Sequence, residues 1–190
     1  MYLREPCFDL EELVKENLHV HTSFSGCAKP EMRVKLIVER ARELKLQRVA
    51  LVDHFNHSDT PMIEKNMADR FVVKLTGTEI PFLFGAELSA YGVGKWLDND
   101  EVNRALDYRL YAANHYHLEI WEQPEEKTPR GYAEHTVKVL TALIEADRAD
   151  CIAHPIYGGY VRVLEDKKAL AAAMTDEELY KLMLLAKKHR

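Results

Sequence analysis

The stretch from Asn17 to Cys27, NLHVHTSFSGC, carries two histidines that are two residues apart in a short apolar run. Side chains at positions i and i+2 of a β-strand lie on the same face, so His19 and His21 are expected to present two imidazoles side by side. Imidazole nitrogen is a common protein ligand of zinc and similar divalent metals. Two unrelated strand histidines, one buried and one exposed, would give the same letters, so the pair alone leaves both interpretations open.

Other potential ligands follow the remaining apolar runs in the same way. The runs end in His54 (LVDH), Glu87 (FLFGAE), His115 (RLYAANH) and His154 (DCIAHP). In parallel α/β proteins the active site lies at the carboxyl ends of the strands, where residues far apart in sequence converge. Each residue alone could instead be a cap, an ion-pair partner or a core histidine. Their shared position predicts a metal cluster of five histidines and one glutamate, with the HxH pair included.

The elements that position these residues alternate between strand and helix. A helical turn is expected around residues 9–15. The predicted strands cover residues 17–21, 48–53, 82–87, 109–114 and 150–153. The predicted helices cover residues 30–45, 60–75, 98–107 and 131–146, and a last helix begins at a capping box formed by Thr175 and Glu178. Pro30 suits the first position of its helix. This alternation predicts an α/β fold with a parallel sheet.

Composition sets the broad class. The 190 residues are 47% hydrophobic and 30% charged, which is typical of one globular domain. The net charge of −5, without a basic and aromatic stretch, argues against a long nucleic-acid partner but leaves small phosphorylated substrates open. Three widely spaced cysteines, Cys7, Cys27 and Cys151, argue for a reducing compartment. No membrane-length apolar stretch or signal-peptide core is present, so we expect a cytoplasmic protein with no membrane partner.

Taken together, the motifs resemble those of the PHP (polymerase and histidinol phosphatase) family of metal-dependent phosphoesterases. They stand in family order across residues 17–155 as LHVHTSFSGC, LVDHFNH, GAELSAY, AANHYH and IAHP. The resemblance implies a distorted (β/α)7 barrel that holds two or three divalent ions, usually zinc, manganese or iron. It implies one ion on His19, His21 and Glu87, a second on Glu87, His115 and His154, and a third bound in part by His54.

The sequence departs from the family pattern at two places. Many members have a further histidine or acid in the loop after HxH, whereas this chain has Ser25, Gly26 and Cys27. Cys27 is either a thiolate ligand or an ordinary loop cysteine. The family's last motif, Asp-x-His, is absent. We therefore expect residues 1–190 to form a single PHP-like domain that is incomplete at its C-terminus, because the chain is truncated or its lineage lost the motif.

The expected activity is hydrolysis of a small phosphate monoester or a nucleotide. Two cations bridged by Glu87 and a water would generate hydroxide near neutral pH and bind the phosphoryl oxygens. His117, two residues after His115, is a candidate phosphate contact or leaving-group acid, or else a solvated loop histidine. The sequence does not indicate the oligomeric state.

Two other functions remain possible from the sequence. An amidohydrolase-like metal hydrolase also begins with HxH, but that family usually bridges its metals with a lysine on the fourth strand, and AANH has none. An inactive metal-binding module with a regulatory or interaction role would explain the missing Asp-x-His. An Asp-x-His encoded beyond Arg190 would favour the enzyme.

Overall fold

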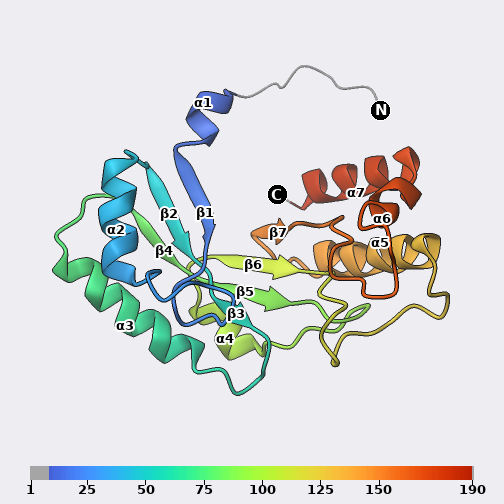
Figure 1. Cartoon of the computed structure of the whole chain (residues 1–190), viewed down its shortest axis with the longest axis horizontal. Helices are drawn as coiled ribbons and strands as arrows, with labels where there is room; N and C mark the ends of the chain where they lie inside the picture. The colour runs from blue at the N-terminus through green and yellow to red at the C-terminus, as the bar shows by residue number, and fades with distance from the viewer. Residues whose placement is uncertain (1–8, 190) are drawn as a thin grey trace. The chain divides into compact units, whose positions relative to one another are not determined.

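The computed structural model describes residues 9–189 (Figure 1). The chain forms two compact units. Unit 1 contains the residues up to Glu87 together with Asp100–Leu110. Unit 2 contains Leu88–Asn99 and the residues from Tyr111 onward. The chain passes between the units within β5 (Ala86–Ser89), between Asn99 and Asp100, and within β6 (Arg109–Ala112).

Unit 1 is built from strands and helices that alternate along the chain. Its elements are α1 (Leu10–Leu13), β1 (Glu16–Val20), α2 (Val34–Glu43), β2 (Arg48–Leu51), β3 (His54–Phe55), α3 (Met62–Leu75), β4 (Phe82–Phe84) and α4 (Asp100–Ala105). Strands β1, β2 and β4 form a parallel sheet in that order. The predicted strand–helix–strand pattern is therefore confirmed, and the carboxyl ends of these strands lie on one side of the sheet.

The core of unit 1 forms where α2 packs against this sheet. The buried residues of α2 recur every three or four positions and so lie on one helical face. They pack with apolar side chains of the three strands, and the cluster consists of Val20, Val34, Ile37, Val38, Ala41, Val49, Leu51, Val73 and Phe84. Burial of this apolar surface holds β1 and β2 in place, and these strands lead directly into the candidate ligands.

The strand predicted over residues 82–87 is divided in two at Gly85. A Cβ at this position would lie 2.0 Å from the carbonyl oxygen of Tyr108 and 3.1 Å from Cγ1 of Val52. The backbone therefore approaches its neighbours more closely than a side chain permits. Main-chain bonds continue on both sides of the division, from Gly85 N to Leu51 O (2.9 Å) and from Glu87 N to Asp53 O (2.9 Å). These bonds fix the backbone that carries Glu87.

Unit 2 packs helices around an aromatic core. Its elements, besides the ends of β5 and β6, are α5 (Pro129–Glu145), β7 (Cys151–Ala153), α6 (Ala169–Ala173) and α7 (Asp176–Lys188). The buried cluster consists of Tyr116, Trp121, Tyr132, Ala133, Val161, Leu164, Leu170 and Met174. Much of this core comes from loops between β6 and α5 and between β7 and α6, so these loops are packed segments.

Several predicted boundaries were wrong. The helix expected from residue 30 begins at Val34, because residues 25–32 form turns and Arg33 is the N-cap. The helix expected from residue 131 begins earlier, at Pro129, because the Thr128 side chain accepts a bond from the Gly131 N–H (3.1 Å). Strand β3 and helix α6 were not predicted, since both are short and carry no clear periodicity.

Two findings bear on the expectations drawn from composition. Cys27 and Cys151 are free and exposed, whereas Cys7 lies outside the described residues. Within residues 9–189, none of the helices has both the length and the apolar character needed to cross a bilayer.

An ion pair in unit 2 connects the start of α5 to the start of α7. Arg130 donates from Nη2 to Oε1 of Glu178 (2.5 Å) and from Nη1 to Oε2 (2.9 Å). The same carboxylate accepts the Thr175 N–H (2.8 Å) and completes the predicted capping box. The hydrogen bonds from Arg130, followed by those from Thr175, lower the pKa of Glu178 to about 2. The charged form of Glu178 therefore stabilises the folded state.

We predict that Glu178→Gln lowers the free energy of unfolding at pH 7 by about 1 kcal/mol, the scale of one helix cap. Because the folded pKa of about 2 is below the ordinary 4.5, this stability is complete above pH 4.5 and is lost as the pH falls toward 2. Urea unfolding at pH 7, 4.5 and 2.5 measures it. Glu177→Gln, which changes only an exposed pair with Lys181, is the control and should have a much smaller effect. A gap between Glu178→Gln and the parent that is as large at pH 2.5 as at pH 7 would contradict the prediction.

Candidate metal centre

The histidine pair lies at the carboxyl end of β1. His19 is in the strand, and His21 is the first residue after Val20 ends it. The two Nε2 atoms are 2.9 Å apart and the ring centroids 4.9 Å apart. The prediction that the two imidazoles lie side by side is confirmed.

The carboxylate of Glu87 lies against three imidazoles in unit 1. Its Oε2 is 3.3 Å from His19 Nε2, 3.2 Å from His21 Nε2 and 3.1 Å from His54 Nδ1. The Glu87 side chain is only 1% exposed. A tetrahedral ion with ligand bonds of roughly 2.1 Å places neighbouring ligand atoms roughly 3.4 Å apart, so this spacing suits a divalent cation. Glu87, His19 and His21 could together hold such an ion.

The electrostatic environment of His54 favours the neutral ring that a metal ligand requires. Burial lowers the pKa of His54, and this effect exceeds the opposing attraction of the Glu87 carboxylate. The neutral imidazole has a lone pair on one nitrogen.

Cys27 lies close enough to join a second group in unit 1. Its Sγ and one ring nitrogen each of His21 and His54 lie within 4.8 Å of one another. Burial raises the pKa of the Cys27 thiol by more than an opposing backbone hydrogen bond lowers it, and the negative charges of Glu87 and Asp53 raise it further. A thiolate here would need the charge of a bound cation.

The remaining predicted site residues lie in unit 2. His115 is buried, and its ring centroid is 5.3 Å from that of His154 and 5.5 Å from that of His117. Burial, followed by the charge of Arg162, lowers the pKa of His117. The ring of His117 also lies 4.7 Å from that of Tyr160. The three histidines that the sequence placed together are therefore neighbours.

Asn114, which the sequence did not single out, orients His154. Its Nδ2 donates to the carbonyls of His154 (2.7 Å) and Tyr157 (3.0 Å), and its Oδ1 lies 3.1 Å from Nδ1 of His154. Because both amide hydrogens are used by carbonyls, Nδ1 of His154 must be the donor to Oδ1. The lone pair of the neutral ring is then on Nε2, the nitrogen available to a ligand.

Sequence reasoning also missed Asp53, Ser25 and Lys65. Asp53 is fully buried and lies 2.5 Å from the Lys65 ammonium of α3. A carboxylate at the end of the apolar run RVALVD was the available signal, because a buried acid needs a partner.

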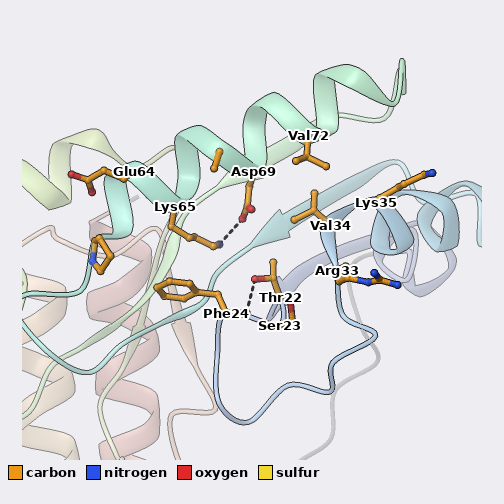
Figure 2. A pocket seen from close by; sticks show the side chains of 12 residues that line it. Thr22, Ser23, Phe24, Arg33, Val34, Lys35, Glu64, Lys65, Asp69 and Val72 are labelled. Atoms are coloured by element: carbon orange, nitrogen blue, oxygen red, sulfur yellow. Dashed lines mark hydrogen bonds and ion pairs between the residues drawn. The ribbon is translucent and has the colours of Figure 1, made fainter.

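Lys65 also lies in the wall of a cavity of about 650 Å³ in unit 1 (Figure 2). This cavity lies between residues 22–24, the start of α2 and residues 61–72 along α3, and the Lys65 ammonium is 2.8 Å from Asp69 there. Its wall does not include His19, His21, His54 or Glu87. Asp53, which the Lys65 ammonium contacts, is not among the residues that line the cavity.

These features define a class: an α/β protein with parallel strands and a cluster of imidazole and carboxylate groups suited to divalent cations. The model of the PHP domain family matches residues 17–190. The chain therefore belongs to the PHP domain family, whose members are generally metal-dependent hydrolases. No curated protein matches the chain.

We predict that the protein binds divalent transition metal, because its ligand atoms already lie at ligand spacing and little ordering remains on binding. Elemental analysis of protein purified without chelator, and of chelator-treated protein after Zn²⁺ or Mn²⁺ is restored, measures this. His57→Ala, which removes an exposed histidine three residues from His54, should keep the parent metal content. Protein that holds no metal even after reconstitution would contradict the prediction.

Proposed function

We propose that this protein is a phosphoesterase that hydrolyses a small phosphate monoester or a nucleotide, with His19, His21, His54 and Glu87 as metal ligands. The observation that supports this most directly is the buried Glu87 Oε2 within 3.3 Å of three imidazole nitrogens. One carboxylate and three neutral imidazoles supply negative charge and lone pairs together, which suits a divalent cation. Bound cations would polarise the phosphoryl group and lower the pKa of a water nucleophile.

The protein's own groups have distinct roles in this proposal. Glu87 supplies the negative charge, which histidine cannot, and its burial strengthens that charge. His115 and His154 are proposed ligands of a second ion, with the His154 ring oriented by Asn114. His117 is proposed to contact the phosphate or to protonate the leaving group, since its lowered pKa makes its protonated form a stronger acid. We also propose the distorted (β/α)7 barrel as the fold.

We predict that His19→Ala with His21→Ala abolishes hydrolysis and leaves the fold largely intact. The pair lies at the open end of β1, so few packing contacts are lost. Release of phosphate from p-nitrophenyl phosphate and from a panel of nucleotides, with circular dichroism as the fold check, measures this. Parent-like turnover by a folded double variant would exclude this pair as catalytic ligands. Parent protein that binds metal but hydrolyses no phosphate ester would favour the inactive module.

We predict that Glu87→Gln lowers metal content and reduces kcat by on the order of a hundredfold or more. Glutamine keeps the shape of the side chain but removes the charge that offsets the cation. Elemental analysis and kcat should therefore fall together. Glu79→Gln, an exposed position before β4, is the control for loss of one negative charge. If Glu87→Gln binds metal and turns over substrate like the parent, Glu87 is structural.

A further inference from the structure

The Asp53 carboxylate is the acceptor for four donors in the interior of unit 1. Oδ1 accepts the Thr22 N–H (2.8 Å) and the Ser25 hydroxyl (2.6 Å). Oδ2 accepts the Thr22 hydroxyl (2.7 Å) and lies 2.5 Å from the Lys65 ammonium. Both Asp53 oxygens are therefore used as acceptors, and the hydroxyl hydrogens of Thr22 and Ser25 form hydrogen bonds with them.

Ser25 has three polar neighbours and only one hydrogen to donate. Besides Asp53 Oδ1, its Oγ lies 3.1 Å from the His54 N–H and 3.3 Å from Nδ1 of His21. The contact with Asp53, at 2.6 Å, is the shortest of the three and joins a hydroxyl to a carboxylate. If the Ser25 hydrogen pointed instead at His21, two oxygen acceptors would face each other at 2.6 Å without a hydrogen between them. Ser25 therefore donates to Asp53.

The remaining two lone pairs of Ser25 then accept hydrogen bonds. One accepts from the His54 main chain, so the other faces Nδ1 of His21, which must carry a hydrogen to make a favourable contact. In a neutral ring this leaves the lone pair on Nε2. That atom lies 2.9 Å from His19 Nε2, which in the metal-free protein donates the hydrogen of this contact, and 3.2 Å from Glu87 Oε2.

We propose that Ser25 is a positioning residue that holds His21 as the Nδ1–H tautomer and so prepares Nε2 to bind a metal. Asp53 fixes the direction of the Ser25 hydroxyl, and Lys65 and Thr22 hold Asp53. The inference depends on the proposed function only in taking His21 as a metal ligand. The tautomer itself is a property of the metal-free protein.

Lys65 makes this arrangement rigid. Its side chain is 6% exposed and also lies 2.8 Å from Asp69, one turn further along α3 (Figure 2). A buried carboxylate that loses its partners is strongly destabilising, so rotation of Asp53 away from Ser25 is unfavourable. The direction of the Ser25 hydroxyl is therefore set before any ligand arrives.

The test is the tautomer of His21 in full-length, metal-free, ¹⁵N-labelled protein above pH 7. A long-range ¹H–¹⁵N correlation spectrum, with the His21 signals assigned by their loss in His21→Gln, distinguishes Nδ1–H from Nε2–H. Zn²⁺ affinity is measured in parallel by competition with a chelator. We expect Nδ1–H in the parent, its loss as the dominant form in Ser25→Ala, and Zn²⁺ binding about 10–100-fold weaker in that variant.

Two further variants separate positioning from packing. Ser25→Thr keeps the hydroxyl and should restore both the tautomer and the affinity. Ser23→Ala removes an exposed hydroxyl from the same loop and should change neither. Parent-like tautomer and affinity in Ser25→Ala would overturn the proposal. An Nε2–H tautomer in the parent would also overturn it, even if Ser25→Ala does not fold. Absence of phosphatase activity would bear on the proposed function alone.

Discussion

Asp53 brings a negative charge into the interior of unit 1, where an unpaired carboxylate would be costly. Its charge is balanced by Lys65 of α3, and its remaining lone pairs are occupied by Thr22 and Ser25 from the loop after β1. The Asp53 carboxylate therefore connects the end of its own apolar run with helix α3 and with the loop after β1. The proposed metal ligands His21 and His54 are joined to the same network through Ser25.

The electrostatics of the candidate metal centre depend on the buried carboxylate of Glu87. Glu87 is buried as deeply as the core, and three imidazoles from different positions, which can be neutral, lie against its Oε2. A divalent cation would satisfy the carboxylate and the lone pairs at once. In unit 2, Asn114 orients His154 through two backbone carbonyls. Each unit thus contains a neutral side chain, Ser25 or Asn114, whose oxygen lies within hydrogen-bond distance of Nδ1 of a histidine, His21 or His154.

Sequence patterns identified the elements of unit 1 other than β3 and the residues at their ends, because apolar runs and helical periodicity report directly on burial. These patterns failed where a boundary or a residue's role depends on three-dimensional contacts. The start of α2 was placed at Pro30 because proline suits a first turn, but residues 25–32 form turns of their own. Ser25 and Asp53 were missed because their roles depend on hydrogen bonds between residues 28 positions apart. No local pattern encodes such a contact.

Gly85 shows how a residue without chemistry can determine a site. Tyr108 and Val52 occupy the space that a side chain at Gly85 would need, and Glu87 follows two residues later in the chain. Any larger residue would push this segment away from its neighbours and move the carboxylate. A random-mutagenesis screen scored for the proposed hydrolysis would therefore recover Gly85 among the inactive variants, alongside the proposed metal ligands. Measurement of folded yield would separate the two groups, because the glycine variants would also lose soluble protein.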